Sequence, residues 1–336
     1  MNEGTLIQAG NKFALLAIRC RTRDLPPCLP LAPGVIATTR PPVEFGDHWR
    51  EWLGTIGHQD FLNSRLFLVV SFESGSHVAV GDENKALNDR LRHWLVGLLL
   101  AGRFSFDKPF FLAGAGGSSE HSIRQFGWWQ PATEILGIGS LPIQRSKLKS
   151  AWMIAQQIDA LNTAGPGWRM TSVLTNFVET RARPDLLDRI HQFCRCIEGF
   201  ILPDPGKTAS QFKSRTELFI GPCNHDLMGR IYEVRSAVEH LHHQKLIEPA
   251  DRTGRVELAQ QAAVLEAIAR GCITRLLSRP CLWPHFQTDD AIQQFWKLPN
   301  AKRRELWGST TPISSLIADF HEYLIGNLEL GLPRNR

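Results

Sequence analysis

The pattern of apolar and polar positions changes character at about residue 144. Earlier in the chain, short apolar runs are bounded by turn residues, which is the pattern of buried strands. Four such runs occur at residues 13–20, 34–39, 65–72 and 108–117. Residues 46–57 and 82–102 instead carry apolar side chains at helical spacing. The pattern predicts a mixed α/β domain over residues 1–143.

After residue 144 the strand signals nearly vanish, and amphipathic helices follow one another. The breaks between them are short: RP at 183–184, PDPG at 203–206, GPC at 221–223 and EPADRTG at 248–254. Short connections make neighbouring helices antiparallel, which favours a helical bundle. The pattern predicts a connecting helix with a GPG hinge at 144–167, the bundle at 168–280 and a C-terminal helical extension at 281–336. The predicted fold class is therefore α+β overall, with an all-α second half.

The composition is that of an ordinary globular chain. Hydrophobic residues make up 43% and charged residues 21% of the 336 residues, which is enough apolar material for a sizeable core. The net charge of +5 is modest and spread along the chain, so it permits a phosphate-rich partner without demonstrating one. Seven cysteines form no CxxC pair, which favours free thiols in a reducing compartment.

No segment has the pattern of a targeting or membrane sequence. The N-terminus lacks the basic start and the apolar core of a signal peptide. The longest apolar run, WLVGLLLA at 94–101, is far shorter than the ~20 residues that a membrane span needs. We therefore expect a cytoplasmic protein that has no membrane partner.

The segment NHDLMGRIYEVRSAVEHLHH, residues 224–243, contains the most concentrated candidate chemistry. As a helix with Asn224 as N-cap, it places its apolar positions on one stripe, which must face the bundle core. The stripe consists of Ile231, Val234, Ala237, Val238 and Leu241. The opposite face consists of Arg235, Ser236, Glu239 and His243. His240 lies beside this polar face, five residues and ~7.5 Å of helical rise beyond Arg235.

An arginine near a histidine suits the cleavage of RNA by its own 2′-hydroxyl. In this reaction the 2′-oxygen attacks the adjacent phosphorus, and negative charge builds on the phosphoryl oxygens. A histidine can take or return the proton, which is typically worth ~10²–10⁴-fold in rate. An arginine can hold the phosphate through two hydrogen bonds and stabilise the developing charge. Neither step needs a metal or a cofactor.

The same segment resembles the signature of HEPN domains, in particular of their ApeA-like branch. The signature is an arginine, four to six residues and a histidine, on a helix that commonly reads tyrosine, a short gap, Arg-Ser, a few apolar residues and histidine. The matching positions are Tyr232, Arg235, Ser236 and His240. CRCIEGFI, with Glu198, resembles the family's apolar helix with one glutamate, and FKSRTELFIG, with Arg215, resembles the following helix. The resemblance covers residues 168–280.

The resemblance implies a helical bundle that forms a homodimer, with the arginine and histidine of both protomers in one cleft. Many members are metal-independent endoribonucleases of toxin–antitoxin, abortive-infection or antiviral systems. By this resemblance Arg235 grips the scissile phosphate, and His240 is the general base or acid. The implied partners are RNA, a second copy of the chain and a protein trigger or antitoxin. The N-terminal domain would then recognise the trigger or the substrate.

Neighbouring residues are expected to support this pair. Glu239, four residues after Arg235, either forms an exposed ion pair with it or orients it and restrains its charge. Glu198 and Arg215 lie on apolar helices and are expected to form a structural pair or to support the site. Many relatives have glycine directly after the histidine, whereas Leu241 is predicted to continue the helix.

Other interpretations of the histidines remain open. His240 and His243 are three residues apart and could share a transition metal, although no carboxylate or thiolate completes an obvious site. A solvated helix face that is rich in histidine is the structural alternative. In the functional alternative, the bundle is a non-catalytic HEPN-like module that binds RNA or a partner protein.

Overall fold

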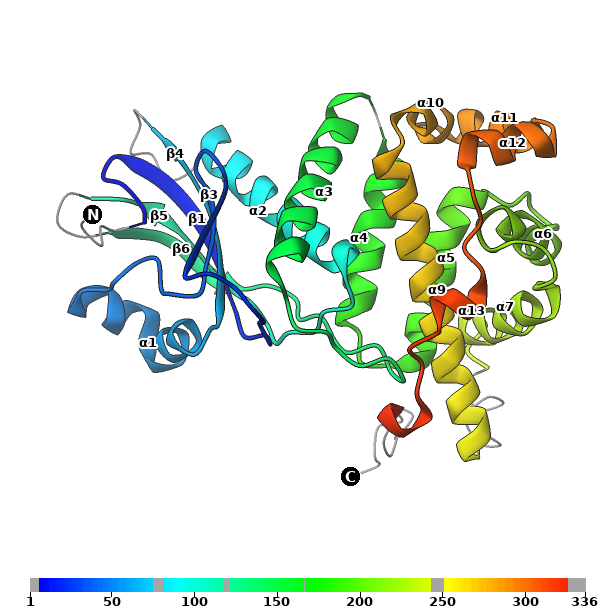
Figure 1. The fold of residues 1–336 in the computed structure, drawn as a ribbon, viewed down its shortest axis with the longest axis horizontal. Helices are drawn as coiled ribbons and strands as arrows, with labels where there is room; N and C mark the ends of the chain where they lie inside the picture. Colours follow the sequence, from blue (N-terminus) through cyan, green and yellow to red (C-terminus); the bar gives the residue numbers. More distant parts are fainter. Residues whose placement is uncertain (1–5, 75–80, 118–120, 166, 243–250, 326–336) are drawn as a thin grey trace. The chain divides into compact units, whose positions relative to one another are not determined.

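The computed structural model describes residues 6–74, 81–117, 121–165, 167–242 and 251–325. The chain divides into two compact units (Figure 1). The first comprises residues 1–132 and 141–159, and the second comprises residues 133–140 and 160–336. An antiparallel sheet in the first unit and helices in the second confirm the α+β fold class.

The sheet of the first unit has six strands in the order β2-β3-β4-β1-β5-β6, and all neighbours are antiparallel. The strands are β1 (Asn11–Ile18), β2 (Cys28–Ala32), β3 (Val35–Thr38), β4 (Leu66–Glu73), β5 (Phe110–Ala115) and β6 (Ser122–Trp128). The four predicted runs correspond to β1, β3, β4 and β5. The sequence pattern missed β2 and β6 because both are edge strands. Their side chains are mostly exposed or half-buried, so neither strand forms a continuous apolar run.

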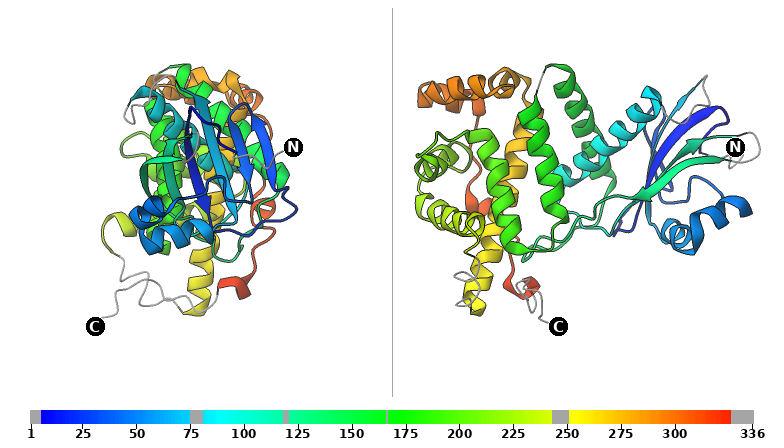
Figure 2. Two further views of the ribbon diagram at one scale, coloured as in Figure 1. Left: turned by 90° about the vertical axis from the view of Figure 1, so that its left-hand side faces the viewer. Right: turned by 180° about the vertical axis from the view of Figure 1, so that it is seen from behind.

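Two helices cover opposite faces of this sheet (Figure 2). The alternating residues Phe13, Leu15 and Ala17 of β1 pack in one core cluster with Leu53 and Phe61 of α1 (Asp47–Leu62). The other face is covered by α2 (Asp82–Ala101), which contacts β1 and β4. Most of α3 (Arg145–Thr163) belongs to the first unit, whereas the sequence pattern assigned this helix to a connection between domains.

The second unit is built around a buried helix. Among the described residues, its long helices include α4 (Trp168–Ala182), α5 (Leu186–Ile201), α6 (Thr208–Ile220), α7 (His225–Glu239) and α9 (Arg252–Ser278). The central helix α5 packs against α4, α7 and α9. Of its 16 residues 11 are buried, and its remaining polar residues form one exposed face. The described helices end close to the predicted breaks at 183–184, 203–206 and 221–223.

The C-terminal extension packs onto this bundle through aromatic side chains. It contains η1 (Pro280–Leu282), α10 (Trp283–Phe286), α11 (Asp289–Lys297), α12 (Asn300–Trp307), α13 (Ile313–Leu316) and η2 (Glu322–Ile325). Phe286 and Trp307 contact Phe200 of α5, with ring centroids 5.8 and 6.4 Å apart. Over the described ranges, no helix combines the length and the hydrophobicity that a membrane crossing requires.

One buried ion pair joins α4 to α9 in the bundle. Arg181 and Glu266 are 3% and 1% exposed, and Arg181 Nη1 lies 3.4 Å from Glu266 Oε1. Arg181 also donates to the carbonyl oxygen of Thr133, and Arg270 Nε lies 3.3 Å from Glu266 Oε1. Burial lowers the pKa of Arg181 from its ordinary value, while Glu266 opposes that shift. Each of the two buried charges is therefore tolerated because the other one compensates it.

Candidate functional site

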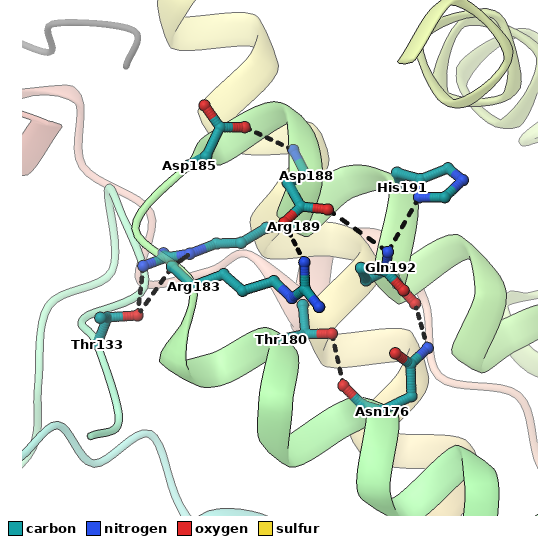
Figure 3. Close-up of polar contacts among 9 residues, drawn as sticks. All are labelled: Thr133, Asn176, Thr180, Arg183, Asp185, Asp188, Arg189, His191 and Gln192. Atoms are coloured by element: carbon teal, nitrogen blue, oxygen red, sulfur yellow. Dashed lines mark hydrogen bonds and ion pairs between the residues drawn. The ribbon is translucent and has the colours of Figure 1, made fainter. Parts of the chain in front are cut away.

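A hydrogen-bonded cap fixes the start of α5, the helix against which the candidate site is built (Figure 3). Asp185 is the N-cap, and its side chain accepts a hydrogen bond from the backbone N–H of Asp188 at 2.7 Å. The Gln192 amide donates to Asp188, and the Asn176 amide of α4 donates to the Gln192 carbonyl oxygen. Arg189 donates to the hydroxyl of Thr133. These contacts hold the exposed face of α5 in a fixed orientation.

The candidate arginine lies where α7 packs on α5. Met228, Ile231, Val234 and Val238 form the buried stripe of α7. Arg235 is 14% exposed and faces α5, where its Nη2 donates to Glu198 Oε2 at 3.2 Å. Its Nη1 forms an ion pair with Glu239, one turn further along α7. The guanidinium also lies 5.6 Å from the ring centroid of Tyr232.

This arrangement corrects the expected partner of Glu198. The sequence suggested a structural pair between Glu198 and Arg215, but the carboxylate pairs with Arg235 instead. Arg215 donates from Nη1 to the carbonyl oxygens of Ile201 and Leu202, at 2.6 and 2.8 Å. Arg215 therefore binds the last carbonyl groups of α5, where positive charge also complements the helix dipole.

Several polar atoms around Arg235 are buried and have no protein partner among the described residues. These are Nε of Arg235, Oε1 of Glu198 and Nε2 of His191. Burial of a polar atom without a hydrogen bond costs free energy, commonly ~1–3 kcal/mol. The three atoms belong to two adjacent helices, α5 and α7, so unpartnered polar groups concentrate where these helices meet.

His191 is the residue at this place that the sequence analysis missed. Its Nδ1 contacts the Gln192 amide at 3.2 Å, and Figure 3 shows the rest of its ring turned away from the other labelled side chains. Burial, followed by the positive charges of Arg235 and Arg195, lowers the pKa of His191, while Asp188 opposes the shift. His191, Arg195 and Glu198 are spaced four and three residues apart, so they share one face of α5. This spacing is the feature of the sequence that could have identified His191 as part of the site.

His240 occupies the end of α7. It is the C-cap residue, it is exposed, and its N–H donates to the carbonyl oxygen of Ser236 at 3.1 Å. The next two N–H groups, of Leu241 and His242, donate to Val238 and Ala237 at 3.1 and 2.8 Å. These two hydrogen bonds are those of a Schellman motif, which ends a helix.

The predicted continuation of the helix at Leu241 is therefore wrong. Leu241 has φ +58°, the left-handed conformation that glycine adopts most easily, and its side chain is 80% exposed. The helix ends here because the buried stripe ends at Val238, so a further turn would bury no apolar surface. Leucine thus has the conformation that glycine has in a Schellman cap.

Replacing Leu241 by glycine is expected to stabilise the protein by ~0.5–1 kcal/mol, because glycine removes the left-handed strain and little burial is lost. The measurement is the urea midpoint of wild type and variant. Leu241→Ala is the control, since alanine keeps the strain and should give no stabilisation. If the helix instead continued through this position, glycine would destabilise it by ~1 kcal/mol.

The described residues contain no set of ligands that would hold the metal ion considered above. Nowhere in the ranges that the structure describes do three His, Cys, Asp or Glu side chains gather as a metal site would require. The rings of His240 and His242 are 6.3 Å apart. His243, the other residue in the metal hypothesis, lies outside the described residues.

The chemical inventory of the site is an arginine held between two carboxylates, an exposed imidazole at the end of the same helix and a half-buried imidazole on the neighbouring helix. Such a set can bind a phosphate and exchange a proton. Comparisons of the chain with protein-family models, with curated proteins and with solved structures found no match.

Proposed function

We propose that the second unit is a metal-independent endoribonuclease of the HEPN type, with Arg235 and His240 as its catalytic residues. The observation that supports this most directly is the setting of Arg235. Its guanidinium is oriented by Glu198 and Glu239 on a packed helix, and an exposed histidine ends that helix five residues later. An oriented cation and an accessible imidazole, here on one helix, are the two groups that 2′-hydroxyl attack on a phosphodiester uses.

In the proposed reaction, Arg235 binds the scissile phosphate and exchanges a carboxylate contact for two phosphate hydrogen bonds. His240 accepts the proton of the 2′-hydroxyl as the 2′-oxygen bonds to phosphorus. The bond between phosphorus and the 5′-oxygen breaks, and that oxygen takes a proton from water while His240 releases its proton to the solvent. The products are a 2′,3′-cyclic phosphate and a 5′-hydroxyl.

The wider biological setting follows from the same resemblance. The active form would be a homodimer in the cytoplasm, in which the two Arg235/His240 pairs share one cleft. Its role would be in phage defence, a toxin–antitoxin pair or a stress response, with a protein trigger or antitoxin that controls it. The first unit would recognise that trigger or the substrate.

A second candidate function is a non-catalytic module that binds RNA or a partner protein. The double pairing of Arg235 favours it, because Glu198 and Glu239 already satisfy the guanidinium charge. The two candidates differ in one respect: only the enzyme breaks phosphodiester bonds.

The Arg235→Lys variant tests the enzyme directly. It is expected to cleave RNA about 10²-fold more slowly, because lysine keeps the charge but loses the two-point grip on the phosphate. The measurement is the initial rate of cleavage of mixed cellular RNA in excess EDTA. The matched control is Arg230→Lys on the same helix, where an exposed arginine pairs with Glu257. Equal rates for both variants would contradict the role of Arg235.

A further inference from the structure

A polar groove of about 630 Å³ lies between α4 and α5 in the second unit. Its lining includes Trp168, Thr175 and Asn176 of α4 and Arg195, Glu198 and Gly199 of α5. This volume falls in the range of ligand pockets, ~300–1,000 Å³. Glu198 belongs both to the groove and to the ion pair with Arg235, so the groove adjoins the proposed catalytic arginine.

One glycine of the lining brings the two helices of the groove close together. A Cβ atom at Gly199 would lie 2.3 Å from Cγ2 of Val173, so glycine is needed for the close approach of α4 and α5. Thr171 and Thr175 supply exposed hydroxyl groups along the α4 side, whereas the Ser172 hydroxyl donates to the carbonyl oxygen of Trp168. The lining is therefore rich in short hydrogen-bonding groups, which suit a sugar–phosphate backbone.

Trp168 provides an aromatic platform in the groove. It is the first residue of α4, and 60% of its surface is exposed. The guanidinium of Arg169 lies 5.0 Å from its ring centroid, and Arg169 is in turn held by two hydrogen bonds of 2.6 Å to Asp289. The ring is thus restrained and remains accessible. An exposed, restrained indole is a stacking surface for a nucleic-acid base.

Arg195 provides positive charge in the same groove. It is exposed, and among the described residues it forms no ion pair, unlike Arg169 and Arg235. It lies three residues before Glu198, on the same face of α5. A phosphate bound to Arg195 would therefore be one helical turn from the carboxylate that holds Arg235. Glu179, the other carboxylate of the lining, can accept a hydrogen bond from a base amino group.

We propose that this groove binds a single-stranded segment of the RNA substrate, with one base stacked on Trp168 and one backbone phosphate on Arg195. The inference rests on the proposed function and extends it from the cleaved phosphate to the neighbouring nucleotides. A single strand is the favoured occupant because its bases are free to stack on an exposed ring, whereas the bases of a duplex are enclosed.

Binding of a non-cleavable RNA measures this site without the reaction. The probe is a fluorescein-labelled single-stranded oligonucleotide with 2′-O-methyl groups throughout, and its fluorescence anisotropy gives the affinity of the full-length protein. Trp168→Ala is expected to weaken binding roughly 5- to 100-fold, which is the range for loss of one base–aromatic stack. Trp168→Phe should retain most of the affinity. Tyr323→Ala, at a 75% exposed tyrosine of η2 in the second unit and outside the groove lining, is the matched control and should bind like wild type.

The salt dependence of binding isolates the phosphate contact. Arg195→Ala is expected to reduce the slope of log affinity against log salt concentration by about 0.7, the value for one phosphate of a single strand. Arg230→Ala, at an exposed arginine of α7 that lies outside the groove lining, should leave the slope unchanged.

The outcomes separate this inference from the proposed function. Weaker binding by Trp168→Ala supports the groove even if the wild type cleaves no RNA, in which case the nuclease alone is rejected. Unchanged affinity of Trp168→Ala overturns the groove even if the wild type cleaves RNA. The groove proposal would also be overturned if duplex RNA competed with the probe as well as single-stranded RNA does. The same holds if the wild-type protein does not bind the probe.

Discussion

Replacing His240 by alanine is expected to slow RNA cleavage by ~10²–10⁴-fold and to leave the fold intact, because a positioned proton acceptor is typically worth that factor. The side chain of His240 is exposed, so its removal creates no cavity. The hydrogen bonds that end α7 come from backbone N–H groups of residues 240–242, and alanine keeps all of them. The measurement is the cleavage rate of a defined single-stranded RNA in excess EDTA.

The neighbouring histidine supplies a matched control for this variant. His242 is exposed, lies in the same helix cap and has its ring 6.3 Å from that of His240. His242→Ala should therefore cleave at close to the wild-type rate. Cleavage that persists in His240→Ala at the wild-type rate would remove His240 from the mechanism, and His191 would then be the next imidazole to test.

Replacing Glu266 by glutamine is expected to destabilise the protein by ~3–5 kcal/mol. The change leaves the charge of Arg181 buried without the carboxylate that compensates it, and such charges carry this cost. The measurement is urea unfolding followed by circular dichroism at a helical wavelength. The control is Glu305→Gln, which removes an exposed ion pair with Lys302 and should cost less than ~1 kcal/mol.

A double substitution checks the reason for this cost. Arg181→Met combined with Glu266→Leu removes both charges and should recover most of the lost stability, because apolar residues of similar volume can replace a buried ion pair. If the double variant were as unstable as Glu266→Gln, uncompensated charge would not be the cause. Packing around the two side chains would then explain the loss.

The sequence predicts those parts of the fold whose apolar pattern is uninterrupted. The buried strands β1 and β4 are continuous apolar runs and were predicted close to their observed bounds. β2 and β6 were not, because edge strands bury few side chains and β2 contains Pro30. The helices of the second unit are amphipathic and bounded by Pro and Gly, which are signals that local sequence carries.

The sequence predicts the site less completely, because its contacts join residues far apart in the chain. The pattern placed Glu198 and Arg235 on helices, but their pairing depends on how α7 packs on α5. The end of α7 was missed because no glycine or proline follows His240, and Leu241 takes the left-handed conformation instead. His191 was missed because the local sequence does not distinguish it from a surface histidine. The difference is the burial of its Nε2 atom, which depends on how the helices pack.

The most direct test of the central claim is the chemistry of the RNA ends that the wild-type protein leaves in excess EDTA. The proposed mechanism predicts cleavage with a 2′,3′-cyclic phosphate on one product and a 5′-hydroxyl on the other. Products with a 3′-hydroxyl and a 5′-phosphate, or cleavage that EDTA abolishes, would contradict it. No cleavage by a folded protein that binds RNA would also contradict the mechanism and leave the non-catalytic RNA-binding module as the function of the second unit.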